Sequence, residues 1–426
     1  MFEAGRANAT KRLNRSAVLR AIAGHERASR ITVAELTGLS RATITRTVDE
    51  LIRAGLVAVS GSFNSSTVGR KSEIVEIKPS GGRIAGIHLG GWSNDVGLST
   101  LGGTLYAEAH LPLIEDQSVE RVLPRVFAAI DALLAADASA APLLGIGIAT
   151  GGDIDSARGR VRSHARFGWQ DVEMRDHVEQ RYGTHVAVVN TFQGVAWAEA
   201  LFAGETGGGS VLFITCSALI GAGFAPHRMI DQGAPDTAGQ LGHTQFGESE
   251  SPCDCGKRGC LQASASDDAL IARALAAIPE MEGASSTPAG SIQRLADLAA
   301  HGHPYALELF QARARLVAPA VAALANTLGP SVLVIGVSDT VFAAREFELI
   351  AAAVRAHLYP PLLSRLRLRP VSAPIAQGGS RAAVAAVLRD LYSPALDLRP
   401  TPRGGFLPVI VTPRPYALEP GRGVCG

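Results

Sequence analysis

The stretch CDCGKRGC, residues 253–260, places three cysteines within eight residues of a 426-residue chain that has only five. Three clustered thiols cannot all pair with one another as disulfides, whereas a metal ion needs no even number of ligands. The few cysteines and an N-terminus without a signal-peptide apolar core favour the reducing cytoplasm, where clustered thiols are more often metal ligands than disulfides. A tetrahedral metal site then needs a fourth ligand.

The length allows two or three domains, and 47% apolar residues suffice for a sizeable core. No uninterrupted apolar window of about 20 residues occurs, so we expect no membrane-spanning helix. Residues 1–72 carry 12 Lys or Arg and 5 Asp or Glu, a net charge of +7 against +1 for the whole chain, so the remainder carries −6. This asymmetry favours contact of the first segment with a polyanion, although a basic tail that binds nothing has the same composition.

Residues 29–61, SRITVAELTGLSRATITRTVDELIRAGLVAVSG, predict a short helix, a turn, a longer helix and a strand. Thr32 is expected to cap the first helix, with Glu35 completing a capping box. Gly38 is expected to end it, because glycine readily adopts the left-handed conformation that follows a helix. This order is that of a helix-turn-helix.

The second helix is predicted over residues 41–54, between the cap residue Ser40 and the stop signal Gly55. Its apolar face is Ile44, Val48, Leu51 and Ile52. In a helix-turn-helix the first turns of this helix read base edges in the major groove, where Arg binds guanine and Thr contacts phosphate or a thymine methyl. The expected DNA contacts are Arg41, Thr43, Thr45 and Arg46.

A polar loop and an alternating strand follow in FNSSTVGRKSEIVEI, residues 63–77, and predict a wing. Its basic tip, Arg70 and Lys71, is expected on phosphate or in the minor groove. With a first helix in residues 8–24, the winged helix-turn-helix is predicted over residues 10–78. The alternative is a small helical domain for protein contacts.

From Ile84 onward, short hydrophobic strands alternate with helical stretches and predict an α/β body with two similar halves. The segment from Leu396 is rich in Pro and Gly, and we expect residues 393–426 to be an extension that is disordered or loosely draped on the body.

A winged helix-turn-helix, a Gly-Gly strand turn at residues 90–91, AGQLGHTQF at 238–246 and CDCGKRGCLQ at 253–262 resemble the ROK family (repressors, open reading frames and kinases). The resemblance covers roughly residues 10–390. It implies a two-lobed actin-like ATPase body, predicted over residues 82–392, with a zinc loop at residues 243–260. In the family pattern one histidine and three cysteines hold a structural Zn²⁺; here these are His243, Cys253, Cys255 and Cys260.

The sequence departs from the family's kinases at three places. His88 and Trp92 stand where the phosphate-binding strand turn has Asp and Thr. In the second phosphate loop, residues 217–223, two glycines are replaced and Leu219 would crowd a nucleotide. Thr191 replaces the Asp that acts as catalytic base, and a threonine hydroxyl cannot serve in that role at neutral pH. We therefore expect no phosphoryl transfer and no enzyme activity.

The resemblance also implies a sugar site whose counterparts include Asn190, Gln240, His243 and Gln262. Two of these positions have Glu in the family and Gln here, so hydrogen-bonding capacity remains while charge is lost. Trp169 is interpreted either as the floor of such a pocket or as a core residue.

The leading hypothesis is a cytoplasmic ROK-type transcriptional regulator, responsive to a sugar or sugar derivative and without kinase activity. We expect double-stranded operator DNA as its partner, a sugar or sugar-phosphate effector, a homodimer or homotetramer, and no membrane partner. Two alternatives are a sugar kinase with an appended DNA-binding domain and a ligand-independent DNA-binding scaffold.

Overall fold

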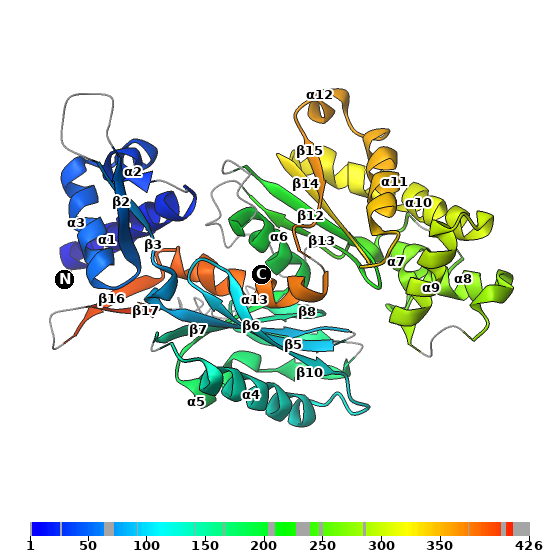
Figure 1. Ribbon diagram of the computed structural model, residues 1–426, viewed down its shortest axis with the longest axis horizontal. Coiled ribbons are helices and arrows are strands. Elements are labelled where there is room, and N and C mark those ends of the chain that lie inside the picture. Colours follow the sequence, from blue (N-terminus) through cyan, green and yellow to red (C-terminus); the bar gives the residue numbers. More distant parts are fainter. Residues whose placement is uncertain are drawn as a thin grey trace, which may run out of the picture. The chain divides into compact units, whose positions relative to one another are not determined.

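The structure is a computed structural model (Figure 1) that describes residues 2–25, 28–63, 72–91, 93–139, 141–164, 167–202, 209–226, 239–246, 250–283, 287–373, 375–401 and 406–411. The chain divides into two units. Unit 1 is Met1–Asn190 with Ala386–Gly426, and unit 2 is Thr191–Ala385. None of the described helices offers an apolar span of membrane length.

Unit 1 begins with the predicted helix-turn-helix and its sheet. The elements are α1 (Phe2–Ala23), β1 (Ala28–Ser29), α2 (Arg30–Thr37), α3 (Arg41–Arg53), β2 (Val57–Phe63) and β3 (Ser72–Ile77). The strands form an antiparallel sheet in the order β1-β3-β2. The side chains of Val18, Val33, Ile44, Val48 and Leu51 are buried between the helices and this sheet. The predicted order of elements is confirmed, whereas the wing tip at residues 64–71 lies outside the described residues.

The caps of α2 differ in part from the prediction. The helix begins at Arg30, and Ser29 caps it by accepting a hydrogen bond from the Thr32 N–H at 3.1 Å. The prediction of Thr32 as N-cap was therefore wrong. The capping hydroxyl oxygen comes from Ser29, three residues earlier, where the helix begins. Gly38 does end α2, with φ +68°, as predicted.

The α/β part of unit 1 is a five-stranded sheet in the order β11-β7-β4-β5-β6. Its strands are β4 (Arg83–Leu89), β5 (Ser93–Thr100), β6 (Leu105–Pro112), β7 (Leu143–Thr150) and β11 (His185–Asn190). The remaining elements are η1 (Pro79–Gly81), α4 (Val119–Ala136), β8 (Asp153–Asp155), β9 (Arg160–His164), β10 (Trp169–Val172) and α5 (Met174–Tyr182). The strand β7 is parallel to β4 and β11, and the hairpin strands β5 and β6 extend the sheet.

Unit 2 contains a four-stranded sheet in the order β13-β12-β14-β15. Its strands are β12 (Val211–Cys216), β13 (Ile220–Ala225), β14 (Val332–Val337) and β15 (Arg367–Pro370). Its helices are α6 (Thr191–Phe202), η3 (Leu241–His243), α7 (Leu261–Ala265), α8 (Asp267–Ala277), η4 (Pro279–Met281), α9 (Pro288–Ala300), α10 (Pro304–Leu328), α11 (Ala343–Arg355) and α12 (Pro360–Leu363). The helix α13 (Ile375–Leu391) begins in unit 2 and ends in unit 1.

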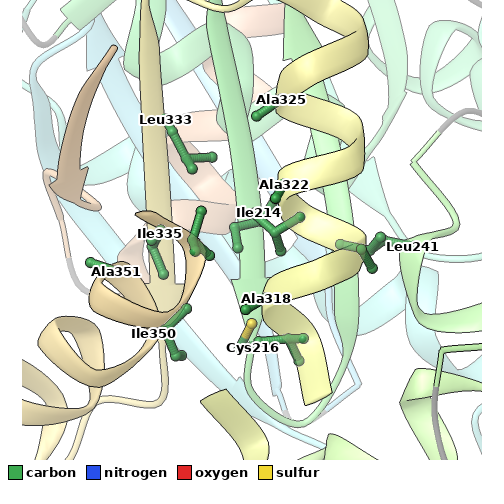
Figure 2. Packing of buried hydrophobic residues seen from close by; sticks show 14 of the residues in the cluster. Ile214, Cys216, Leu241, Ala318, Ala322, Ala325, Leu333, Ile335, Ile350 and Ala351 are labelled. Atoms are coloured by element: carbon green, nitrogen blue, oxygen red, sulfur yellow. The ribbon is translucent and has the colours of Figure 1, made fainter. Parts of the chain in front are cut away.

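Small side chains bring α10 close to the sheet of unit 2. Ala318, Ala322 and Ala325 recur at helical spacing and are buried against β12 and β14 (Figure 2). Because alanine adds little bulk, the helix axis can approach the strands, and the larger Ile214 and Leu333 fill the space between.

The C-terminal segment corrects a prediction. Residues 396–411 were expected to be disordered or loosely draped, yet Leu396–Pro400 (β16) and Phe406–Ile410 (β17) pair as an antiparallel hairpin. Leu396, Leu398 and Ile410 are buried, since alternate residues of a strand point to the same side. Residues 402–405 and 412–426 lie outside the described residues.

A fully buried arginine joins three helices of unit 2. The Arg313 guanidinium on α10 donates to Asp267 of α8 at 2.5 Å, to Glu346 of α11 at 2.6 Å and to the Cys216 carbonyl at 3.2 Å. The Ser338 hydroxyl donates a further hydrogen bond to Asp267. Removing one partner of such a network leaves buried charge without compensation.

We predict that Arg313→Met destabilises the protein by about 3–5 kcal/mol, because Asp267 and Glu346 would lose their counter-ion. The matched control is Arg315→Met on the same helix, since Arg315 is exposed and pairs with the exposed Glu308. The control should change the free energy of unfolding by less than about 1 kcal/mol. Urea unfolding followed by circular dichroism measures both; equal losses for the two variants would contradict the assignment.

Candidate functional site

The second helix of the helix-turn-helix presents a polar face away from its buried side. Ser40 caps α3 by accepting a hydrogen bond from the Thr43 N–H at 3.2 Å, as predicted. The side chains that line one surface hollow along this face are Arg41, Ala42, Thr45, Arg46, Asp49 and Arg53. Three of these six are arginines, so the face combines positive charge with hydroxyl and methyl groups.

Arg30 holds α3 in place and neutralises the one acid on its exposed face. Its guanidinium donates to the Thr45 carbonyl at 3.2 Å and to Asp49 at 2.8 Å. Sequence analysis did not identify this role, because the partners lie 15 and 19 residues further along the chain. With Asp49 paired, the arginines dominate the charge of the face.

The predicted DNA contacts differ in their surroundings. Arg41, Thr45 and Arg46 are exposed, whereas Thr43 is half-buried with its hydroxyl 2.9 Å from that of Ser40. The Thr43 side chain therefore takes part in the helix cap. The wing residues Arg70 and Lys71 lie outside the described residues.

The predicted metal ligands converge in unit 2. The candidate ligand atoms of His243, Cys253, Cys255 and Cys260 all lie within 4.8 Å of one another. The Cys253 Sγ lies 3.6 Å from His243 Nδ1, and the Sγ atoms of Cys255 and Cys260 are 3.7 Å apart. With metal–sulfur distances of about 2.3 Å and metal–nitrogen distances of about 2.0–2.1 Å, tetrahedral angles require sulfur–sulfur separations of about 3.8 Å and sulfur–nitrogen separations of about 3.6 Å. The two short separations match such a geometry, and the four residues could hold one metal ion.

The loop folds tightly around these thiols. Pro252 and Arg258 form a β-bridge, and the Cys253 N–H donates to the Lys257 carbonyl at 2.9 Å. Gly256 and Gly259 have φ values of +86° and +74°, a left-handed conformation that a side chain would strain. The loop therefore needs glycine beside two of its cysteines.

The thiols differ in their acidity. Burial, with a further contribution from Cys255, raises the pKa of the Cys260 thiol to about 12. The backbone N–H of Lys257 lowers the pKa of the Cys255 thiol. Thiolates so close together repel one another, and a bound cation would stabilise them.

Two backbone amides of the turn that corresponds to a phosphate loop are engaged in hydrogen bonds. The Ser217 N–H points to the Leu219 carbonyl at 3.3 Å, and the Ile220 N–H donates to the Gln262 side-chain oxygen at 2.8 Å. The Gln262 side-chain NH₂ donates to the Ala218 carbonyl at 2.8 Å. Gln262, predicted as a ligand residue, thus binds the turn at Ala218 and the start of β13 at Ile220, a role that the sequence did not reveal.

His88 stands where the phosphate-binding strand turn of the family's kinases has Asp, and its imidazole pairs with a carboxylate. His88 Nδ1 lies 3.3 Å from Asp95 of β5, and the same carboxylate contacts His110 of β6 at 2.5 Å and accepts from Ser93 at 3.0 Å. Burial by itself would raise the pKa of Asp95, but the hydrogen bonds from His88, His110 and Ser93 lower it overall. Trp92 lies outside the described residues.

The other predicted effector residues lie at strand and turn ends. In unit 1, Asn190 ends β11, is buried, and has its amide 3.5 Å from the Gly152 carbonyl. In unit 2, Gln240 is exposed and precedes the turn η3 that carries His243. The Leu261 N–H, next to Gln262, donates to the Thr244 carbonyl, next to His243, at 3.1 Å.

Trp169 belongs to the core of unit 1. Its side chain is 3% exposed, and its indole N–H donates to the Gln117 carbonyl at 2.7 Å. The rings of His164 and Phe167 pack beside it. The interpretation as a core residue is confirmed, and that of a pocket floor was wrong, because the indole is covered by its own unit.

The fold and these sites define a class: a chain with an N-terminal winged helix and a two-lobed actin-like α/β body. The model of the ROK family matches residues 84–385, which is more than half of the chain, and that of the MarR family matches residues 12–62. The chain therefore belongs to the ROK family and carries a MarR-type winged-helix DNA-binding domain.

Individual relatives include regulators and kinases. A xylose repressor of Caldicellulosiruptor bescii is 30% identical over 61% of this chain, but the match spans only 65% of the repressor's length. The dual regulator NagC of Escherichia coli is 25% identical over 78% of this chain and 82% of its own. A glucokinase of Thermotoga maritima is 28% identical over 60% of this chain and 81% of its own.

A solved structure supports the fold. The crystal structure of a ROK family transcriptional regulator, a homologue of the E. coli MLC protein, aligns with a TM-score of 0.73. The alignment covers 89% of this chain and 96% of that one at 24% identity. An alignment of this extent is longer than the body alone, so that structure has the two-part architecture, a winged helix and a body, that the sequence predicts.

Proposed function

We propose that this protein is a ROK-type, DNA-binding transcriptional regulator that responds to a sugar or sugar derivative and does not transfer phosphoryl groups. The observation that carries the proposal is the basic face of α3 on a MarR-type winged helix. We propose domain limits of residues 10–78 for the winged helix, 82–392 for the body and 393–426 for the extension. The protein would act in the cytoplasm, where its DNA is accessible.

The proposed DNA contact follows from helix geometry. The capped start of α3 exposes Arg41, Thr45 and Arg46, which can reach base edges when the helix lies in the major groove. Thr43 would support the cap and contact the phosphate backbone, and Arg70 and Lys71 would add phosphate contacts from the wing. A two-fold operator requires two such helices, so we propose a homodimer or homotetramer.

The proposed effector is a hydroxyl-rich small molecule. The relatives named xylose repressor and NagC support a sugar or sugar derivative. Asn190 and Gln240 would contribute amide groups that donate to and accept from hydroxyls. Gln262 would shape the site by holding the turn at residues 217–220, and His243 would fix the adjoining wall through the metal.

Three features argue against phosphoryl transfer. Thr191 stands where a catalytic base is needed, and a threonine hydroxyl cannot accept the proton of the sugar hydroxyl at neutral pH. The amides of Ser217 and Ile220, which a phosphate would require as donors, already donate to the Leu219 carbonyl and to the Gln262 side chain. His88 is paired with Asp95 and offers no carboxylate to a magnesium ion.

We propose Zn²⁺ as the metal, bound by His243, Cys253, Cys255 and Cys260. Three thiolates with one imidazole in tetrahedral array are the ligands that zinc prefers in structural sites. All four positions come from the protein, so the ion would stabilise the loop and leave no position for a substrate. Its chemical contribution would be to hold the thiolates together and to fix the start of α7.

We predict that Arg41→Ala or Arg46→Ala weakens binding to specific DNA by about 1–3 kcal/mol, because each would lose a contact to a base edge. Lys71→Ala should weaken binding to all sequences alike and reduce the salt dependence. Fluorescence anisotropy with specific and random duplexes measures both effects. Arg345→Ala, an exposed arginine of unit 2, is the control. Equal losses on specific and random DNA for the α3 variants would contradict base readout.

We predict about one tightly bound zinc ion per chain, and a loss of this zinc in Cys255→Ser and His243→Ala. Elemental analysis of the native protein measures the content. Cys216→Ala is the control, because Cys216 is buried in the core of unit 2 and outside the cluster. Native protein without zinc, with reactive thiols and an intact fold, would overturn the assignment.

Calorimetry against a panel of sugars and sugar phosphates should detect binding of at least one member, which Asn190→Ala weakens. An assay of ATP-dependent phosphorylation of the same panel should detect no product. Phosphorylation abolished by a substitution in the body would establish the kinase alternative. Absence of binding by any member would favour the ligand-independent scaffold.

A further inference from the structure

The C-terminal hairpin of unit 1 packs on the first helix of the winged-helix domain. The Ser16 hydroxyl donates to the Tyr392 carbonyl at 2.6 Å, and the Arg12 guanidinium donates to the Pro394 carbonyl. In Figure 1 the orange-red hairpin β16–β17 lies next to the blue helix α1, in keeping with these bonds. Segments more than 370 residues apart in sequence therefore meet.

One buried side chain joins this hairpin to the recognition helix. Arg15 of α1 is 3% exposed, and its guanidinium donates to the Leu396 carbonyl at 3.1 Å. The same group lies 3.8 Å from the Glu50 carboxylate of α3 and 3.9 Å from that of Asp397 in β16. Glu50 is itself buried and also pairs with Lys11 at 3.0 Å. Arg15 is therefore the shared partner of α1, α3 and β16.

The hairpin is also fixed to the α/β part of unit 1. The buried Tyr392, just before β16, donates its hydroxyl to the Leu101 carbonyl after β5 at 3.1 Å. The strand β17 packs against β7, and the ring of Phe406 in β17 lies 5.0 Å from the Arg53 guanidinium carbon at the end of α3. The winged helix thus has a second attachment to the α/β part, besides the chain that passes through η1.

We propose that Arg15 and the β16–β17 hairpin form a coupling element through which the α/β part of unit 1 sets the position of the recognition helix α3. The inference rests on the proposed function, because α3 reads DNA only under that proposal. It assigns Arg15 as a positioning residue and not as a DNA contact.

The buried ion pairs of Arg15 favour a role in positioning α3 over a role in stability alone. Burial lowers the pKa of the Arg15 guanidinium although Glu50 and Asp397 oppose the shift. A buried ion pair contributes little net stability compared with apolar packing, but in some proteins it selects one arrangement of its partners. A shift of β16 would therefore move the partner of Arg15 and, through Glu50, act on α3.

The test compares the wild type with two substitutions in the full chain, Arg15→Met and Phe406→Ala, and with a shortened chain that ends at Ser393. A chain that ends at Val411 keeps the hairpin and is the control for shortening. Hydrogen–deuterium exchange measures the protection of α1 and α3, and fluorescence anisotropy measures affinity for specific and random DNA. Arg399→Ala, an exposed residue of β16, is the matched point control.

We expect faster exchange in α1 and α3 and a loss of specific affinity of about 5- to 150-fold for Arg15→Met and for the chain ending at Ser393, with little change on random DNA. Phe406→Ala should give a smaller loss in the same direction, and both controls should match the wild type. Adding Arg15→Met to the shortened chain should cost less specific affinity than the same substitution costs in the full chain, because both changes remove the contacts of Arg15 with β16.

Losses that multiply in the combined variant would overturn the proposal, since Arg15 would then act within the winged helix alone. Unchanged exchange and affinity in both the shortened chain and Phe406→Ala would also overturn it. If the wild type binds no DNA sequence selectively, the proposed function fails. In that case the exchange data still decide whether the hairpin holds α1 and α3.

Discussion

Four ligand atoms, from His243, Cys253, Cys255 and Cys260, lie within 4.8 Å of one another, and the residues around them link this cluster to the neighbouring elements of unit 2. Cys260 directly precedes α7, and Gln262 in the first turn of that helix binds the turn at residues 217–220. The Asp267 N–H at the start of α8 donates to the Ser217 carbonyl at 3.0 Å. The cysteine loop runs directly into α7, and hydrogen bonds connect α7 and the start of α8 to the turn at residues 217–220.

The same linkage supports the proposal that this ROK-type body does not transfer phosphoryl groups. Transfer of a phosphoryl group needs amide donors directed at the phosphate and a base near the acceptor hydroxyl. Here the amides of Ser217 and Ile220 donate to acceptors of the protein itself, and the base position is Thr191. What remains is a set of amide and hydroxyl groups suited to holding a ligand, joined to a winged helix.

Local patterns were sufficient to predict much of the fold and of the sites. Alternating apolar residues predicted the strands, and Ser40 and Gly38 predicted the ends of the helices around the turn, because these signals act over a few residues. The clustering of cysteines predicted a metal site for the same reason. The hairpin β16–β17 was missed because Pro and Gly outweigh the alternation of Leu396, Leu398 and Ile410. The roles of Arg15 and Gln262 depend on partners roughly 380 and 40 residues away, which no local pattern specifies.

The most direct measurement is selection of duplexes by the intact protein from a pool of random DNA at about 0.15 M salt, an ionic strength at which non-specific phosphate contacts are weakened. The account predicts enrichment of one sequence with two related half-sites, their centres about one helical turn of DNA or a multiple of it apart. A selected pool that cannot be distinguished from the starting pool would contradict the central claim that α3 reads DNA sequence.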